Sequence, residues 1–215
     1  DNDKQLVADI EAAIRKNCFL QDERLYTLLA VWVMHTHIVD FFVYTPILSL
    51  FAVAARGKTR TGRTITWMSR RGIHTESIRQ ADIIRKADRF TATYFFDVID
   101  IWKTAERGDA QDILLARFNR GIRTARVLNP EKPGFNDTQH FACFGATIIA
   151  TNEEVSSYLD SRTINIVMHR ATKIFEDDPK ETDFLPLKER ATAFRARMLG
   201  TSIPNVPKPG LGRLG

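Results

Sequence analysis

The sequence predicts an α/β fold in which a parallel β-sheet is flanked by helices, with a helical segment at the N-terminus. Short runs of β-branched and aromatic residues alternate with longer stretches whose apolar residues recur at helical spacing. Successive runs are about 20 residues or more apart, which leaves room for a crossover helix between parallel strands. Several runs also end in polar residues that can carry chemistry, as expected where the carboxyl ends of parallel strands meet.

The composition fits one sizeable globular domain. The chain has 215 residues, of which 44% are hydrophobic and 27% are charged, as in ordinary globular proteins. The formal net charge of +5 suits a nucleic-acid partner, although proteins that bind no nucleic acid also show such an excess. Cys18 and Cys143 lie far apart without metal-ligand spacing, which indicates a reducing compartment. No signal-peptide pattern is visible, so we expect a cytoplasmic protein.

Residues 1–42 are expected to form the N-terminal helical segment, packed on the sheet. Leu6, Ile10 and Ile14 recur at helical spacing. Asp22 is suited to cap a longer helix over residues 23–42, which is apolar on most faces and therefore buried.

The apolar stretch between residues 25 and 51 is the part of the chain that most resembles a membrane span. His35, His37 and Asp40 interrupt it, so no run of about 20 apolar residues exists and we expect no membrane association. The two histidines face different sides of a helix and have no Cys or His close to them in sequence, which disfavours a metal site.

The first central strand is predicted at residues 47–50, and a possible phosphate-binding loop follows it. Gly57, Lys58 and Thr59 open a helix expected to reach residue 71. Backbone N–H groups at such a helix start can cradle phosphate, a Lys can reach the β/γ oxygens and a Thr hydroxyl can bind Mg²⁺. The full pattern has a Gly where this chain has Ala52, and a solvated surface turn is the alternative interpretation.

Two further strands end in polar side chains. The strand at residues 93–96 leads into Asp97, where a carboxylate could hold the water shell of Mg²⁺. An ordinary strand end before a helix-capping Asp is the alternative. The strand at residues 147–150 leads to Asn152, whose amide could orient an attacking water. Together with Lys58, these polar ends are expected at one edge of the sheet.

The remaining elements complete the alternation of strands and helices. A short extended piece is expected at residues 73–75, a helix with a basic face at 77–90, a helix at 110–120, an extended segment at 121–127 beside a hairpin loop at 129–140, a short helix ending near residue 160 and a strand at 162–168. Arg120, Arg123 and Arg126 crowd the extended segment. Residues 43–175 are therefore expected to form the core, 176–200 an acidic loop with a basic helix, and 201–215 a flexible tail.

The order of these motifs resembles that of AAA+-type, superfamily 3 helicase-like P-loop ATPase domains, as found in primase–helicase replication proteins of phages, plasmids and integrative elements. The resemblance covers about residues 20 to 170. It rests on Ala30-Val-Trp-Val-Met-His-Thr-His37, Arg56-Gly-Lys-Thr-Arg60, Asp97-Val-Ile-Asp100, Phe118-Asn-Arg-Gly-Ile-Arg123, Phe144-Gly-Ala-Thr-Ile-Ile-Ala-Thr-Asn152 and Leu159-Asp-Ser-Arg-Thr-Ile164.

The resemblance implies a site for ATP and Mg²⁺ and a DNA motor that works as a ring, most plausibly a hexamer. ATP would be bound by residues 56–60, from Arg56 to Arg60, and Mg²⁺ by Thr59 and Asp97. Asn152 would position the nucleophile, and Arg162 would reach a neighbouring subunit's γ-phosphate as an arginine finger, unless it is an ordinary ion-paired strand-end residue.

Other arginines are expected at the partner surfaces of such a ring. Arg123 is a second candidate for an intersubunit or DNA contact, and Arg120 and Arg126 lie close to it in sequence.

The chain departs from the resembled pattern at Val98, where the family usually has a Glu that activates water. Asp100 could substitute for it, or hydrolysis could be slow. Two hypotheses therefore remain open. In the first, the chain is a ring-forming, ATP-hydrolysing motor on DNA, such as a replicative helicase of a mobile element. In the second, it is a nucleotide-binding assembly or DNA-binding module with weak or no ATP hydrolysis.

Overall fold

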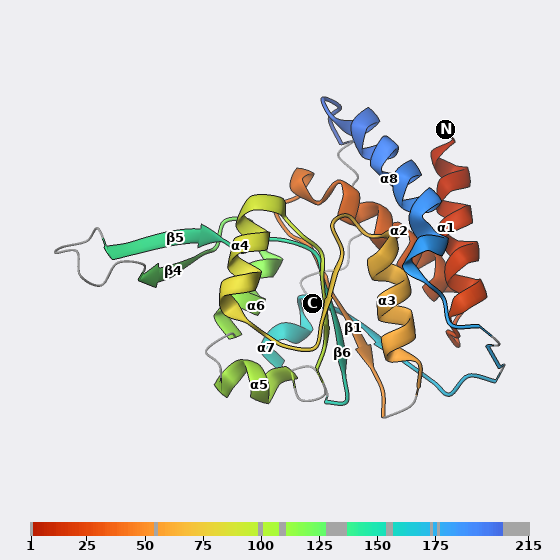
Figure 1. Ribbon diagram of the computed structural model, residues 1–215, viewed down its shortest axis with the longest axis horizontal. Helices are drawn as coiled ribbons and strands as arrows, with labels where there is room; N and C mark the ends of the chain where they lie inside the picture. Colours follow the sequence, from red (N-terminus) through yellow and green to blue (C-terminus); the bar gives the residue numbers. More distant parts are fainter. Residues whose placement is uncertain are drawn as a thin grey trace.

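A computed structural model of the chain describes residues 2–53, 56–98, 101–107, 111–127, 137–153, 157–172, 174–175 and 177–203. At its centre is a five-stranded sheet (Figure 1). The strands lie in the order β2 (Ile73–Thr75), β3 (Tyr94–Asp97), β6 (Thr147–Thr151), β1 (Ile47–Phe51) and β7 (Thr163–Val167). All neighbouring strands are parallel. The expected fold class, an α/β fold with a parallel sheet flanked by helices, is confirmed.

One face of the sheet is covered by helices from both ends of the chain. Helix α3 (Lys58–Met68) lies directly on the strands, and α1 (Asp3–Asn17), α2 (Arg24–His37) and α8 (Leu185–Met198) pack beside it. Figure 1 shows α8 and α1 side by side, so the two ends of the chain share one layer. Gly62 permits the close approach of α3, because a Cβ at this position would lie 2.2 Å from the Phe95 ring.

The opposite face is covered by the middle of the chain. Apolar side chains of α4 (Gln80–Phe90), α5 (Ile101–Arg107), α6 (Gln111–Phe118) and α7 (Ser157–Asp160) form a second core cluster against Tyr94, Phe96 and Ile149. The first cluster contains Leu48, Leu50, Phe95, Ile148 and Ala150 from the other face. Buried side chains therefore alternate between the two faces along β3 and β6, as strand geometry requires.

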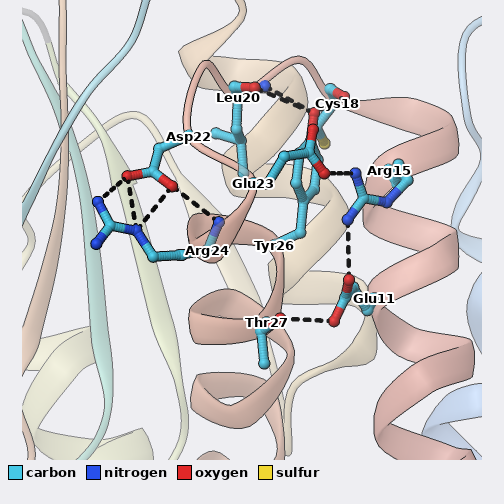
Figure 2. Close-up of polar contacts among 9 residues, drawn as sticks. All are labelled: Glu11, Arg15, Cys18, Leu20, Asp22, Glu23, Arg24, Tyr26 and Thr27. Carbon is cyan, nitrogen blue, oxygen red and sulfur yellow. Dashed lines mark hydrogen bonds and ion pairs between the residues drawn. The ribbon is translucent and has the colours of Figure 1, made fainter.

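The corner between α1 and α2 is held by local polar contacts (Figure 2). The Tyr26 hydroxyl accepts from the Leu20 N–H at 2.9 Å. Arg15 pairs with Glu11 at 2.9 Å and also with Glu23. Asp22, expected as a cap, accepts the N–H of Arg24 at 2.9 Å. This corner fixes the angle at which the N-terminal helices approach the sheet.

A two-stranded antiparallel hairpin, β4 (Arg123–Val127) and β5 (Thr138–Ala142), stands apart from the main sheet. In Figure 1 it projects beyond α4 on the side of the molecule away from α1. The N–H of Ala142 donates to Asp88 of α4 at 3.0 Å, which ties the base of the hairpin to that helix.

The amino ends of the central strands are tied together by the side chain of Arg117 from α6. Its guanidinium donates to the carbonyl oxygens of Ala92 at 2.8 Å and Ala146 at 2.7 Å, and to the Thr147 hydroxyl at 2.7 Å. It also lies 4.9 Å from the centre of the Tyr94 ring. Arg117 is fully buried, and burial lowers its pKa to about 10, so it stays charged at neutral pH.

Several element boundaries differ from those expected. The helix expected over 23–42 ends at His37, and Val39–Phe41 form a separate 3-10 turn, η1. The helix after the first strand ends at Met68 rather than near 71, because the next residue, Ser69, takes an extended conformation with ψ 156°. Helix α5 was not expected, and a 3-10 turn, η3 (Glu181–Phe184), interrupts the acidic loop and buries Phe184.

Within the described part of the chain, no helix combines the length and apolar character needed to cross a membrane.

Candidate functional site

The carboxyl ends of β1, β3 and β6 lie level with one another at one edge of the sheet. Phe51 is paired with Thr151, and Asp97 with Ala150. The chain leaves β1 toward α3 on one face and leaves β6 toward α7 on the other. In α/β proteins, ligands bind at the carboxyl ends of adjacent parallel strands whose connections part in this way. We refer to this position, at the ends of β1, β3 and β6, as the crevice.

The start of α3 presents an open helix N-terminus at this crevice. Gly57 precedes the helix with φ 80°, and no side chain caps the first turn. A Cβ at Gly57 would meet no atom of the described residues within 4 Å, so these residues leave space beside Gly57. Unpaired N–H groups and the helix dipole favour an anion here. Residues 54 and 55, between strand and helix, lie outside the described residues.

Lys58 reaches from the first residue of α3 back across the carboxyl edge. Its ammonium donates to the Asn152 side-chain oxygen, to the Ala52 carbonyl oxygen, and to the Val53 carbonyl oxygen at 3.3 Å. Burial lowers the pKa of Lys58, while the charge of Asp97 opposes this shift. The structure thus brings three of the expected site residues, Lys58, Asn152 and Asp97, to one edge.

Asp97 has a neighbour that the sequence did not indicate, His74 of β2. The nearest nitrogen of the His74 ring lies 3.8 Å from an Asp97 carboxylate oxygen. The His74 ring also stacks on Phe95, with centres 4.8 Å apart. Only the strand order reveals this pair, because β2 and β3 are neighbours at the level of residues 74 and 95.

Glu153 is a second residue that sequence reasoning missed. It follows Asn152 and pairs with Lys103 of α5 at 2.8 Å, while its other carboxylate oxygen is buried and has no hydrogen-bond partner among the described residues. The Thr151 hydroxyl fixes the turn by accepting the Glu153 N–H at 3.0 Å. The sequence shows an acidic residue directly after Asn152 at a strand end, but it does not show that a carboxylate oxygen of this residue is buried.

The other residues of the expected loop face different surroundings. Thr59 is exposed at the helix start, and Arg56 precedes Gly57 at the same end. Arg60 points toward the C-terminal segment instead: it donates to the Asp177 carbonyl at 2.9 Å, pairs with Asp178 at 2.5 Å and lies over the Phe175 ring. Arg60 is therefore engaged within the chain and away from the crevice.

Arg162 lies at the opposite, amino edge of the sheet. It directly precedes β7, its carbonyl accepts from Ile47 at the start of β1, and its guanidinium lies over the Phe118 ring at 5.8 Å. A five-residue strand spans about 16 Å, so Arg162 is a strand length away from the Lys58 crevice of the same chain.

The remaining expected arginines also lie outside the crevice. Arg120 lies over Phe144 near the amino edge, Arg123 is exposed on β4, and Arg126 bonds to Gln80 of α4. Asp100 lies outside the described residues.

The chemistry of the crevice suits a phosphate-bearing ligand better than a bare metal ion. A lysine ammonium and open helix N–H groups favour anions, whereas no group of three or more His, Cys, Asp or Glu side chains among the described residues could hold a metal ion. Thr59 and Asp97 offer oxygen ligands of the kind Mg²⁺ uses together with phosphate oxygens and water.

Comparison with protein-family models and with curated proteins finds no match to this chain.

Proposed function

We propose that the carboxyl-edge crevice binds ATP with Mg²⁺, and that the chain is an ATP-hydrolysing, ring-forming motor domain acting on DNA, such as a replicative helicase of a mobile element. The observation that carries the proposal is the position of Lys58. Lys58 is the first residue of α3, at an open helix N-terminus, and its ammonium donates to the Asn152 side chain. Asp97 ends β3, the strand that neighbours β6. Cation, amide and carboxylate come from three separate elements and converge at one edge.

Each group has a role that its chemistry supports. When ATP binds, Lys58 would exchange one oxygen acceptor of the protein for a phosphate oxygen. Its ammonium would therefore be hydrogen-bonded both with and without ATP. Thr59 and Asp97 would hold Mg²⁺, which when bound would withdraw negative charge from the phosphate oxygens. The Asn152 amide, released from Lys58, would orient a water for attack.

The position of Arg162 supports assembly. Because Arg162 lies at the amino edge, an ATP phosphate that it contacts would be one bound beside Lys58 of another copy of the chain. A ring, most plausibly a hexamer, brings the amino edge of one subunit to the carboxyl edge of the next. Arg120 and Arg123 are exposed near the same edge and would contact the neighbour or DNA.

A second candidate function is favoured by Val98, which leaves the end of β3 without the usual water-activating acid. In this alternative the chain is a nucleotide-binding assembly or DNA-binding module with weak or no ATP hydrolysis. Glu153, with one unpaired carboxylate oxygen, lies one residue beyond Asn152, so an acid is still present near the crevice.

Phosphate release by the purified chain, with and without single-stranded DNA, separates the two functions. We expect release that depends on Mg²⁺ and rises with DNA. Asp97→Asn should retain most ATP binding and lose Mg²⁺-dependent release, because the amide keeps the size of the side chain without its charge. ATP binding with no release under any condition would favour the second function. Equal loss of binding and release in Asp97→Asn would indicate a folding role for Asp97.

A further inference from the structure

The hairpin and α4 enclose a groove away from the Lys58 crevice. Its volume is about 910 Å³, and its walls are the outer face of α4 on one side and β4 and β5 on the other. The Asp88–Ala142 hydrogen bond and the contact of Arg126 with Gln80 hold the two walls together. Figure 1 shows the hairpin reaching out from α4, so the groove lies where the two elements join.

A second hollow continues the groove toward the amino edge of the sheet. Its volume is about 390 Å³, and it is lined by Arg71, Gly72, Ile73 and Ala92. Lys86 and Phe90 line both hollows. The two hollows are therefore adjacent along α4, and together they are longer than a single compact ligand such as inorganic phosphate requires.

The walls of the two hollows are strongly basic. Among the described residues, five cationic side chains and one carboxylate line them. The cations are Arg71, Arg85, Lys86, Arg89 and Arg126, and the carboxylate is Asp88. Asp88 already accepts the Ala142 N–H, and Lys86 pairs with Asp82 of the same helix at 2.9 Å. Arg85 and Arg89 are exposed along α4, so at least two cations are presented to a ligand in the groove.

Aromatic rings lie among these cations. Phe90 is 47% exposed at the end of α4, in the region shared by the two hollows, and Phe141 of β5 lines the groove. Arg71 fixes Phe90 by donating to its carbonyl at 2.6 Å and lying over its ring. Cations that follow a backbone of phosphates, together with rings on which bases stack, are the combination that binds single-stranded nucleic acid.

We name the two hollows together the α4 groove. We propose that single-stranded nucleic acid binds along it, between α4 and the hairpin. The proposal rests on the nucleic-acid partner of the proposed function and gives it a site that is separate from ATP. A single strand fits better than a duplex, because the bases of a duplex are already stacked and its phosphates alone could not use Phe90. An acidic peptide would match the charge but would gain less from exposed rings.

The first test measures anisotropy of a fluorescein-labelled thymidine 20-mer without ATP. Arg85→Gln/Arg89→Gln should weaken binding about ten-fold at low salt and should lower the slope of log affinity against log salt by about 1.4, since each lost contact removes about 0.7 on a single strand. The matched control is Lys4→Gln/Lys16→Gln, which removes the same charge from exposed positions of α1. Equal weakening in both double variants, or in neither, would overturn the proposal.

The second test concerns the ring. Phe90→Ala should weaken binding of the 20-mer by about five-fold or more through lost stacking, with an unchanged salt slope because no charge is removed. Poly-glutamate should compete poorly at equal charge. If Phe90→Ala binds like the parent and poly-glutamate displaces the oligonucleotide at equal charge, the groove is a general polyanion or acidic-peptide surface and the proposal is wrong.

Calorimetric titration of the same variants with ATP keeps the two sites distinguishable. ATP binding should be unchanged in Arg85→Gln/Arg89→Gln, which lies away from Lys58. A chain that binds the 20-mer through the groove but does not bind ATP would overturn the proposed function and leave the groove intact. A chain that binds ATP but not the 20-mer would overturn the groove proposal and leave the proposed ATP site intact.

Discussion

The two edges of the central sheet each hold a cation bonded to backbone carbonyl oxygens, yet the two cations are in different situations. At the amino edge, Arg117 is fully buried and bonds to Ala92, Ala146 and Thr147. At the carboxyl edge, Lys58 is only partly buried, and one of its partners, Asn152, is an exposed side chain. Burial lowers the pKa of both residues.

The difference shows which cation can take part in binding. The guanidinium of Arg117 contacts only buried groups among the described residues, so its bonds cannot be exchanged without opening the core. These groups are the carbonyl oxygens of Ala92, Cys143 and Ala146, the Thr147 hydroxyl and the Tyr94 ring. Lys58 faces an open helix N-terminus with space in front of Gly57, where a phosphate can replace a protein acceptor. Access to solvent therefore separates the cation that is fixed in the core from the one to which the proposed function assigns a ligand.

The largest effect is expected at the carboxyl edge. Lys58→Ala should abolish ATP binding, because it removes the side-chain cation at the proposed phosphate position, and should leave the fold intact. Isothermal calorimetry measures the binding, and the thermal midpoint serves as the control. Unchanged ATP affinity would mean that the crevice does not bind phosphate and that Lys58, like Arg117, has no role in ligand binding.

The next effect links the two edges across subunits. Arg162→Ala should bind ATP normally and lose hydrolysis by about 10³–10⁵-fold, the range known for arginine fingers. Mixing Arg162→Ala with Lys58→Ala protein should restore part of the activity, since some interfaces then pair an intact Lys58 with an intact Arg162. No recovery at any ratio, with oligomers verified by light scattering, would count against a role in trans.

The amino edge itself should respond in stability. Arg117→Leu should lower the free energy of unfolding by about 3 kcal/mol, because it leaves buried carbonyl and hydroxyl oxygens without donors. Urea unfolding measures this, with Arg120→Leu, an exposed arginine near the same edge, as a control expected to change by about 0.5 kcal/mol or less. Similar losses in both variants would show that Arg117 has no special structural role.

The last effect is a pH dependence. His35, bonded to Thr45 just before β1, and His37, bonded to the Met68 carbonyl, both have their pKa lowered to about 4 by burial. Below about pH 6.5 the unfolded chain binds protons at both histidines while the folded chain does not, so stability should fall as the pH drops toward 4. The slope is about 1.4 kcal/mol per pH unit for each histidine.

His35→Gln should remove one of these two contributions and keep a polar partner for Thr45. Urea unfolding at pH 7, 6 and 5 would then show a shallower loss of stability than in the parent. A slope equal to that of the parent would mean that His35 binds a proton equally well in the folded and the unfolded chain. Solvent would then reach this part of the amino edge more than the burial of His35 indicates.

Local sequence patterns predict much of the fold. The runs at residues 47–50, 93–96 and 147–150 are short, apolar and followed by polar residues, and each became a buried parallel strand. The helical spacing of Leu6, Ile10 and Ile14 likewise became the buried face of α1. Such patterns depend on the period of side-chain direction along a strand or helix, which any short segment carries by itself.

The sequence placed Lys58, Asp97 and Asn152 at one edge, but only the tertiary structure decided which other residues lie beside them. The strand order brings His74 beside Asp97, places Lys103 against Glu153, and separates Arg162 from Lys58 by the length of a strand. The same packing buries Arg117 with carbonyl partners, turns Arg60 toward residues 177 and 178, and joins α4 to the hairpin in one basic groove. These relations connect residues far apart along the chain, and no local period encodes the order in which strands pair.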